Sequence, residues 1–363
     1  MSLAARLTID LNAVEHNLNV ARQHCKSSKI MAVVKADAYG HGLERVAANL
    51  AAADGFAVSS VEEGVQLRRV HAHHPITVLK GFSDDQELET VIQQALTPVI
   101  HYTYQLTLLN RLTRTFDARD PAHPDLWLKL NTGMNRLGFP VCELESVYQQ
   151  LNKILSGASV GLMTHLASAD EENGIQTDVQ LRCFEEMASP YANPKSVANS
   201  AALLTQPRSY YDWVRPGLML YGASPVQNRT ASSFGLKPAM TFAATLIAIQ
   251  RCQKGQAIGY NGTWVCPENM DVGIVSAGYG DGYPRHISES TPVLLHDRRT
   301  EIVGRVSMDM LAIDLRGLNA KVGDEVVLWG RGLPIDEVAR CAGTISYELM
   351  CKLTARVSRR YIQ

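Results

Sequence analysis

The sequence predicts an α/β protein in which an N-terminal (β/α)8 barrel of the TIM type is followed by a mostly antiparallel, β-rich C-terminal domain. Two observations support this prediction. From about residue 10 to residue 225, short apolar segments alternate with amphipathic ones roughly eight times. After about Lys237, strand-like segments follow one another with only Gly, Pro and Asp turns between them. We therefore divide the chain into a barrel, residues 1–235, and a second domain, residues 236–363, and allow the first few residues to pair with the second domain.

Eight short apolar segments, each bounded by turn residues, supply the strands of the predicted barrel. Helical segments such as LERVAANLAAA, DDQELETVIQQA, ELESVYQQLNKIL and VQLRCFEEMA lie between most of them. Asp10 is placed to cap a first helix that has Val14, Leu18 and Ala21 on one face. Eight such units fit a closed barrel better than an open doubly wound sheet, although a miscount of one strand would leave both architectures open. The strand segments are KIMAVVK, GFAVSS, ITVLKG, TPVIHY, DLWLKLN, VGLMTHL, KSVANS and WVRPGLMLYG.

The second domain contains segments typical of antiparallel strands. They are separated by glycine, proline and aspartate, which favour tight turns. A short helical segment, IDEVARCAG, and a tail that contains Tyr347 follow them. The predicted strand segments are MTFAATLIAIQRC, DVGIVSAGYG, TPVLLHD, TEIVGRVSMDMLAIDL and DEVVLWG.

Composition and charge argue against several classes of function. The 363 residues are 46% hydrophobic, which is ample for a large core. Lys and Arg number 35 against 36 Asp and Glu, without a basic stripe, so nucleic acid and membranes are poor partners. The N-terminus lacks a signal-peptide pattern and no run of about eighteen apolar residues occurs, so we expect a cytoplasmic protein. The seven cysteines are scattered, so we expect reduced thiols and no metal.

A lysine ends the first apolar run. Met31 to Val34 are typical of a buried strand, and Lys35 follows at once, before the turn residues of ADAYGHG. A buried ammonium group is costly unless it is paired, neutralised or used in chemistry. A single lysine in this position is more often solvated at the rim, so its meaning depends on the other strand ends.

The other predicted strand ends also carry polar residues. In a (β/α)8 barrel the C-terminal ends of all strands meet at one mouth, where active sites lie. Taken singly, His165 would be a hydrogen-bonded core histidine, Arg136 an ion-pair partner at the rim, and Ser200 a helix cap. Together the strand ends predict one polar site. Its members are Lys35, Tyr39, Arg136, His165, Asn199, Ser200, Arg215 and Gly217.

This set of residues is typical of a site for a phosphorylated aldehyde. Ser200 and Gly217 follow the seventh and eighth strands, where barrels often bind phosphate through backbone N–H groups. Pyridoxal 5'-phosphate needs such a cradle, and it needs an amine for a Schiff base, which Lys35 would supply. Arg215 would then reach the pyridine nitrogen, and His165 would lie against the ring.

Longer segments resemble a known family, the fold-type III, pyridoxal-phosphate-dependent alanine racemases. AVVKADAYGHG is similar to the lysine motif of that family. The resemblance covers essentially the whole chain, in the same order, through KLNTGMNRLGF, THLASADE, ANSAA, VRPGLMLYG, GYNGTW, GYGDGYPR, GRVSMDM and TISYELM. It implies an isomerase that interconverts L-alanine and D-alanine, either for peptidoglycan or for alanine catabolism.

The resemblance implies a role for each site residue. Lys35 would hold the cofactor as an internal aldimine and act as the base for D-alanine, while Tyr260 would be the opposite-face base for L-alanine. Arg136 and the backbone N–H of Met308 would bind the substrate carboxylate. The cofactor phosphate would be held by Tyr39, Ser200, Gly217, Leu218 and Tyr347, with Asn199 beside them, Arg215 at the pyridine nitrogen, and His165 near the ring and Tyr260.

Supporting residues and a partner are implied as well. Lys129 corresponds to a lysine that is carbamylated in several relatives, although Asn131 stands here where aspartate is common. Tyr279 would line the entry corridor, and Asp309, in GRVSMDM, would support the site. Because the two domains would lie end to end, Tyr260 would reach the active site of a second subunit. The resemblance therefore implies a homodimer with shared active sites.

Three other functions stay open at this point. A racemase of the same fold with broader specificity would also act on serine, lysine or arginine. A fold-type III decarboxylase would release carbon dioxide, but GYNGTW and SMDM resemble the racemases more closely. A non-catalytic pyridoxal-phosphate carrier would have no need of the second domain.

Overall fold

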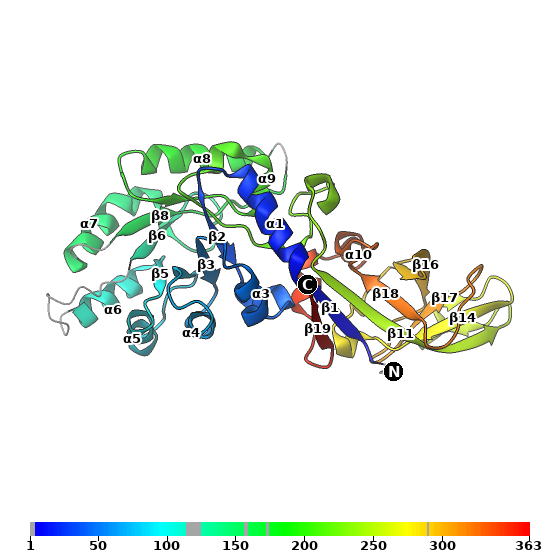
Figure 1. Cartoon of the computed structure of the whole chain (residues 1–363). Coiled ribbons are helices and arrows are strands. Elements are labelled where there is room, and N and C mark those ends of the chain that lie inside the picture. Colours follow the sequence, from blue (N-terminus) through cyan, green and yellow to red (C-terminus); the bar gives the residue numbers. More distant parts are fainter. Residues whose placement is uncertain (1–3, 114–124, 156–158, 172–173, 289) are drawn as a thin grey trace.

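The computed structural model describes residues 4–113, 125–155, 159–171, 174–288 and 290–363. Within them, parallel strands follow one another around a closed ring in the order β2-β3-β4-β5-β6-β8-β9-β10 (Figure 1). The ring closes where β10 pairs with β2, and β5 continues directly into pairing with β6. The predicted (β/α)8 barrel is therefore confirmed, and an open doubly wound sheet is excluded.

The barrel strands end earlier than the sequence pattern indicated. β2 ends at Val33 and β8 at Met163, so Lys35 and His165 lie just beyond the sheet. Both residues lie at the barrel mouth and are not paired with a neighbouring strand. The short β7 (Phe139–Pro140) pairs with the end of β6. The barrel strands are β2 (Lys29–Val33), β3 (Gly55–Val58), β4 (Ile76–Val78), β5 (Thr97–Ile100), β6 (Leu126–Asn131), β8 (Val160–Met163), β9 (Lys195–Ser196) and β10 (Trp213–Val214).

Amphipathic helices cover the outside of the barrel. The first of them starts at the predicted cap, because Asp10 accepts a hydrogen bond from Ala13 N at 3.0 Å. Another buries Val147 and Leu151, which lie four residues apart on one face. The outer helices are α1 (Leu11–His24), α3 (Leu43–Asn49), α4 (Val61–Arg68), α5 (Asp85–Gln93), α6 (Thr103–Thr113), α7 (Leu144–Ile154), α8 (Ile175–Ala188) and α9 (Ser200–Thr205).

The C-terminal domain is a mainly antiparallel sheet, as predicted, in the order β14-β17-β16-β15-β18-β11-β1-β19. The long β11 (Met240–Cys252) pairs with β18 over its first half and with β14 over its second half. A separate hairpin, β12 and β13, carries the turn Tyr260–Gly262. The other elements are β12 (Ala257–Ile258), β13 (Trp264–Val265), β14 (Met270–Val275), β15 (Pro292–Leu295), β16 (Arg298–Val303), β17 (Leu311–Asp314), β18 (Glu325–Trp329), α10 (Ile335–Cys341), α11 (Ser346–Cys351) and β19 (Ser358–Ile362).

The first strand, β1 (Arg6–Asp10), belongs to the sheet of the C-terminal domain. It lies between β11, to which it is antiparallel, and β19, to which it is parallel (Figure 1). Its Leu7 and Ile9 are buried in a continuous apolar core that includes residues of both domains. That shared core fixes how the barrel mouth lies relative to the C-terminal helices. The domain boundary near residue 235 stays a prediction.

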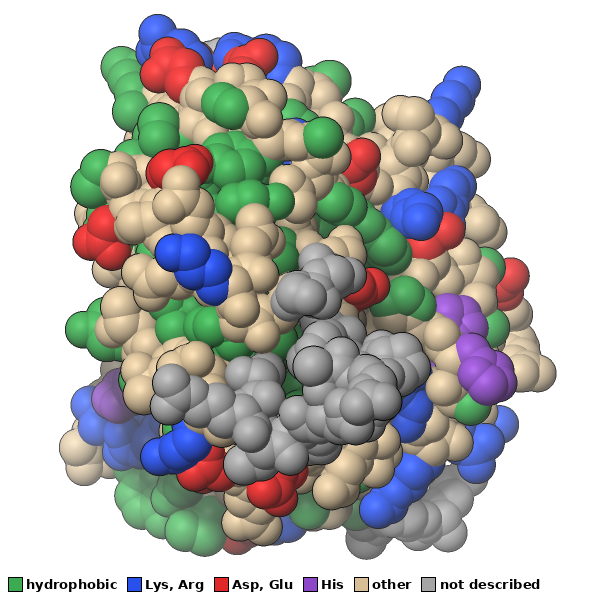
Figure 2. All heavy atoms as spheres, turned by 90° about the vertical axis from the view of Figure 1, so that its left-hand side faces the viewer, with side chains coloured by type: hydrophobic (Ala, Val, Ile, Leu, Met, Phe, Trp, Pro, Cys, Tyr) green, Lys and Arg blue, Asp and Glu red, His purple; other side chains and the backbone are tan. Residues whose placement is uncertain are grey.

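The surface carries both charge signs close together. On the face drawn in Figure 2, the described Lys and Arg side chains are interspersed with Asp and Glu, in keeping with the formal net charge of -1. No helix in the described part of the chain is long and apolar enough to cross a membrane. A dense group of cationic side chains occurs instead at the barrel mouth.

Candidate active site

A cavity of about 530 Å³ lies at the C-terminal ends of the barrel strands. Loops that follow several different strands supply its walls, and α11 of the C-terminal domain adds Tyr347. The structure therefore brings most of the predicted site residues together, although their roles stay predictions. Those that line the cavity are Lys35, Tyr39, Lys129, Arg136, His165, Asn199, Ser200, Arg215, Gly217, Leu218 and Tyr347.

Lys35 begins a left-handed backbone turn, α2 (Lys35–Gly40). The four residues from Ala36 to Tyr39 all have φ between 52° and 55°, and none of them is glycine. The left-handed conformation costs a non-glycine residue about 1–2 kcal/mol, so four in succession need support from the surrounding structure. Lys35 and Tyr39, near the two ends of this turn, both line the cavity.

Side chains from within and beyond the turn hold it in place. Asp37 accepts a hydrogen bond from Leu43 N at 2.7 Å and forms an ion pair with Arg359 of β19 at 2.6 Å. His41 Nδ1 donates to the carbonyl oxygen of Tyr39 at 2.9 Å. Burial lowers the pKa of His41 to about 4, so the ring is neutral at physiological pH and carries its proton on Nδ1.

Two lysines of the cavity have lowered pKa values. Burial, reinforced by Arg136 and opposed by the Glu63 carboxylate, lowers the pKa of Lys35. Lys129 is only 8% exposed, and burial together with Arg215, Arg136 and Lys35 lowers its pKa to about 7. Both amines are therefore neutral and nucleophilic at a lower pH than an ordinary lysine.

Arg215 is buried and held by the barrel strands. Its guanidinium donates to Ser196 Oγ at 2.5 Å and to the carbonyl oxygens of Thr164 at 2.6 Å and Val197 at 3.2 Å. Burial lowers the pKa of Arg215 to about 10, so it remains charged at neutral pH. Its Nη2 lies 3.4 Å from His165 Nδ1. Burial and the neighbouring cations, Arg215 first among them, hold the pKa of His165 well below its usual value, so this imidazole is neutral.

A small polar cradle forms where the last two barrel strands end. Ser200 Oγ accepts a hydrogen bond from Gly217 N at 2.7 Å, which leaves the serine proton free to donate. A Cβ atom on Gly217 would come within 2.7 Å of the Tyr39 hydroxyl oxygen, so only glycine allows this approach. Asn199 caps α9 by accepting from Ala202 N at 3.0 Å. The cradle thus presents two hydroxyl groups beside a glycine backbone.

The cavity is strongly cationic. Three lysines and two arginines line it, and none of its described lining residues is Asp or Glu. A phosphate and a substrate carboxylate would both be stabilised in such a field. Pyridoxal 5'-phosphate fits these residues, because the cavity offers a lysine of lowered pKa and a cradle that a Cβ atom would fill. The five basic residues are Lys35, Lys80, Lys129, Arg136 and Arg215.

The predicted residues of the C-terminal sheet do not line this cavity. Tyr260, in the turn between β12 and β13, is 65% exposed, and Met308 is 52% exposed. Tyr279 is also exposed, and Asp309 forms an ion pair with Arg356 at 2.6 Å. Within one chain, these four predicted residues therefore lie apart from the barrel residues.

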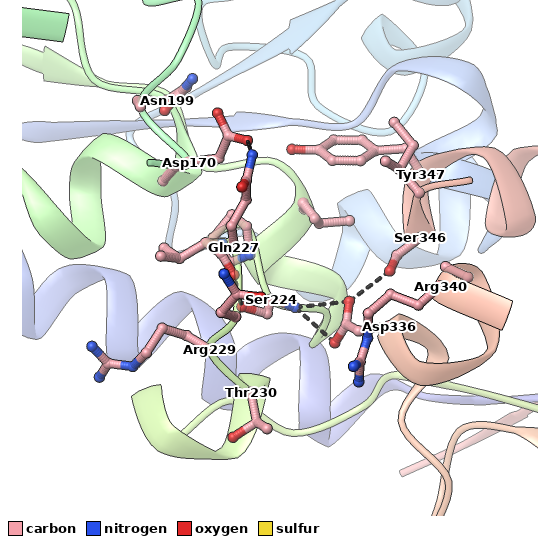
Figure 3. Close-up of a pocket in the computed structure, with 18 of the residues that line it drawn as sticks. Asp170, Asn199, Ser224, Gln227, Arg229, Thr230, Asp336, Arg340, Ser346 and Tyr347 are labelled. Atoms are coloured by element: carbon pink, nitrogen blue, oxygen red, sulfur yellow. Dashed lines mark hydrogen bonds between the residues drawn. The ribbon is translucent and has the colours of Figure 1, made fainter. Parts of the chain in front are cut away.

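A second cavity, of about 810 Å³, adjoins the first between the barrel and the C-terminal domain (Figure 3). Asp336 accepts hydrogen bonds from Ser224 N at 3.1 Å and from Ser346 Oγ at 2.5 Å, which ties α11 to the barrel. On the barrel side, Gln227 donates to Asp170 at 2.7 Å. The residues common to both cavities are His165, Asn199, Leu218, Ile345 and Tyr347.

Several cavity residues were not predicted from the sequence. Lys80 and Ser59 follow β4 and β3, so the strand-end argument used for Lys35 could have found them. Glu63, which does not line the cavity but accepts a hydrogen bond beside Lys35, lies on α4. Its position away from a strand end gave no reason to select it from the sequence. The remaining lining residues are apolar and carry no functional signal: Val33, Leu79, Leu137, Met163 and, just before α11, Ile345.

Comparison with known proteins decides the family. The N-terminal domain family of alanine racemases matches residues 9–225, and the C-terminal domain family matches residues 239–361. An alanine racemase from Nitrosococcus oceani is 50% identical over 353 residues, which cover 97% of each chain. This chain belongs to the alanine racemase family. The family resemblance inferred from the sequence motifs is thereby confirmed.

Solved alanine racemases share the fold over their whole length. The biosynthetic alanine racemase of Pseudomonas aeruginosa is 42% identical, with a TM-score of 0.95 and complete coverage of both chains. The alanine racemase of Bartonella henselae, whose crystal structure contains covalently bound pyridoxal phosphate, is 28% identical. Its TM-score is 0.89, over 99% of this chain and 100% of that one.

Proposed function

We propose that this chain binds pyridoxal 5'-phosphate through Lys35 and racemises alanine at the barrel mouth. The observation that carries the proposal is the position of Lys35: an amine of lowered pKa, on a strained turn, beside a cationic cavity. Membership of the alanine racemase family supports the reaction and the substrate. The cofactor bound covalently in the Bartonella henselae relative supports the choice of cofactor.

The barrel residues would hold the cofactor at both ends. Ser200 and Tyr39 would donate their hydroxyl protons to its phosphate, next to Gly217 and Leu218. Arg215 would face its ring nitrogen. An arginine is always charged and only donates, so a ring nitrogen opposite it stays unprotonated, which favours racemisation over the other reactions of this cofactor. When bound, pyridoxal phosphate supplies an electron sink that makes the α-proton of alanine acidic enough for a modest base.

Two bases would exchange that proton from opposite faces. With D-alanine, the neutral Lys35 amine would take the proton from one face and the Tyr260 hydroxyl would donate a proton from the opposite face, which gives L-alanine. With L-alanine the roles would be reversed: the Tyr260 side-chain oxygen would take the proton and the protonated Lys35 would donate one. A single base would have to swing around the substrate, so two fixed bases are the simpler arrangement. Arg136 and the backbone N–H of Met308 would hold the substrate carboxylate so that the α-carbon lies between the bases.

A homodimer with shared active sites would bring these halves together. Tyr260 and Met308 are exposed and lie outside the cavity of their own chain. In a two-fold symmetric dimer each chain would present both residues to the barrel mouth of its partner. The exposure of the Tyr260 turn supports this assembly, because an exposed apolar ring and a methionine side chain are typical of a surface that is covered by a partner.

Lys129 would be carbamylated. Its amine is buried and its pKa is lowered to about 7, so the neutral form needed for reaction with carbon dioxide is abundant at physiological pH. The carbamate would place a negative charge among Arg136, Arg215 and Lys35, which otherwise repel one another.

Chiral chromatography tests the proposed reaction directly. Purified protein incubated with L-alanine and the cofactor should form D-alanine until the two enantiomers are equal. Serine, lysine and arginine serve as a panel for the broader racemase, and equal turnover of all four substrates would favour that alternative. Release of carbon dioxide would indicate a decarboxylase. Yellow protein without any turnover would indicate a carrier.

A further inference from the structure

Glu63 is an acidic residue beside the Lys35 turn that neither the cavity lining nor the proposed function uses. Its Oε1 accepts a hydrogen bond from Ala36 N at 2.7 Å, and its Oε2 accepts one from Ser59 N at 2.7 Å. Ala36 directly follows Lys35 and is the first of the four left-handed residues. Ser59 directly follows β3, the neighbour of β2 in the barrel. One carboxylate therefore joins the loops that leave two adjacent strands.

The helix that carries Glu63 places this carboxylate. Ser60 caps the N-terminus of α4, and its hydroxyl accepts a hydrogen bond from Glu63 N at 3.4 Å. Glu63 thus lies in the first helical turn, where the helix dipole favours negative charge. Both hydrogen bonds that its carboxylate accepts are short and charge-assisted, and such bonds are about twice as strong as neutral ones.

Glu63 is also a countercharge to Lys35. Arg136 and Lys80 disfavour the charged form of Lys35, whereas the Glu63 carboxylate favours it and raises its pKa. The described lining of the cavity contains no carboxylate of its own. Glu63 acts from outside that lining, through the backbone of the turn.

We propose that Glu63 is a positioning residue for Lys35, which it holds toward the cavity by fixing Ala36, the first of the four residues with positive φ. This role rests on the proposed function, in which Lys35 is the amine that receives the cofactor. Asp37 and His41 hold later parts of the turn, at Asp37 itself and at the Tyr39 carbonyl. Without Glu63, the N–H groups of Ala36 and Ser59 lose their acceptor, and the end of the turn nearest Lys35 is released.

Glu63→Gln tests this role, because an amide has only one acceptor oxygen and cannot serve both N–H groups. Glu62→Gln is the matched control, since it removes the same charge from the adjacent, exposed residue of the same helical turn. Hydrogen exchange of the apoprotein reports on the turn without any cofactor. The Ala36 and Ser59 amides should exchange at least about tenfold faster in E63Q and at the wild-type rate in E62Q.

Cofactor affinity gives the second measurement. Fluorescence titration of the apoprotein with pyridoxal phosphate should show binding about ten- to a hundredfold weaker in E63Q and within about twofold of wild type in E62Q. A merely structural role would lower the melting temperature of E63Q and leave both its cofactor affinity and its Ala36 exchange unchanged. That result would overturn the proposal.

Glu63→Asp separates geometry from charge, and it decides the matter if E63Q does not fold. Aspartate keeps the charge but is too short to reach both N–H groups, so E63D should lose cofactor affinity as E63Q does. Wild-type affinity in E63D would mean that the charge alone suffices, and the positioning role would be wrong. If the wild-type protein bound no pyridoxal phosphate, the proposed function would fall. Separately, if the Ala36 amide hydrogen exchanged at the wild-type rate in E63Q, the proposal that Glu63 fixes the turn would be wrong.

Discussion

The barrel mouth and the C-terminal sheet present their predicted site residues in opposite ways. In the barrel, Arg215 is 4% exposed and its guanidinium contacts three barrel oxygens, and Lys129 is almost as deeply buried. In the C-terminal sheet, Tyr260 is 65% exposed and Met308 is 52% exposed. The barrel half is assembled within one chain, whereas the other half faces outward. Among the described residues of one chain, the barrel residues therefore line a common cavity, whereas Tyr260 and Met308 lie outside its lining.

Exposure of the Tyr260 turn does not mean that the turn is loosely specified. Gly259 and Asn261 have positive φ, which suits glycine and asparagine. A small apolar cluster of its own, which includes Cys266 and Met270, packs beneath this hairpin. The turn thus has a defined shape although the Tyr260 side chain is exposed.

The barrel half depends most on Lys35. Lys35→Ala should lower racemisation by about 10⁴-fold or more, because one substitution removes both the anchor of the cofactor and one base. Borohydride reduction of the wild-type holoprotein, followed by peptide mapping, should place the cofactor on the Lys35 peptide. Lys80→Ala, which removes another lysine of the same cavity, is the control and should keep the label. A label on Lys80 or Lys129 would contradict the assignment.

The outward half depends on Tyr260. Tyr260→Phe keeps the ring but removes the phenol, so racemisation should fall about a hundred- to ten-thousandfold in both directions while the yellow colour persists. In heavy water, D-alanine should still exchange its α-proton at Lys35, and L-alanine should hardly exchange. NMR of each enantiomer measures this, with Tyr148→Phe on α7 as the control. If both enantiomers exchanged their α-proton equally fast in the Tyr260 variant, a mechanism with a single base would be favoured.

Mixing two inactive chains tests whether the halves meet between subunits. Lys35→Ala and Tyr260→Phe chains, allowed to exchange subunits, should regain roughly a quarter of wild-type activity. Half of the dimers would then be mixed, and each mixed dimer would have one intact site of two. Activity is read by chiral chromatography, and subunit exchange by native mass spectrometry. Mixed dimers without activity would show that each site is built within one chain.

The smallest expected effect concerns Lys129. Its pKa is lowered to about 7, so the fraction of neutral amine should rise as the pH increases from about 6 to about 8. With ¹³C-bicarbonate, a carbamate signal should therefore appear over that range and be absent at the acidic end. Lys129→Arg, which cannot form the carbamate, should lack the signal and lose less activity than the Lys35 or Tyr260 variants. A signal that is independent of pH would disprove the proposed titration.

Closure of the barrel explains why so many of the barrel residues that line the cavity could be predicted from the sequence. His165 and Arg215 are fifty residues apart in the sequence, yet parallel strands that close into a ring must bring their C-terminal ends to one mouth. The strand ends themselves were misjudged by about two residues, because the predicted segments ran on through Lys35 and His165, whereas strand pairing ends at Val33 and Met163. The apolar pattern indicates burial and does not indicate where pairing stops.

The left-handed turn after Lys35 could not be predicted in the same way. Ala36 and Ala38 have no preference for positive φ, and only Gly40 and Gly42 hint at an unusual backbone. The conformation is imposed by distant contacts, such as those of Asp37 with Arg359 and of Ala36 with Glu63. Tertiary contacts of this kind leave no local pattern. Tyr260 does not line the cavity of its own chain, so its role as the second base stays a proposal.

The position of β1 between β11 and β19 constrains the order in which parts of the chain can fold during synthesis. Arg6 pairs with Ala243 of β11 and with Ser358 of β19, so β1 has both of its neighbours only after β19 has been synthesised. The barrel strands emerge between β1 and β19 and can close earlier, since domains generally fold as they are synthesised. Tyr347, which completes the cavity, lies on the helix just before β19. The cavity is thus complete only after α11 has been synthesised, so a chain that has reached only the barrel strands carries Lys35 without Tyr347.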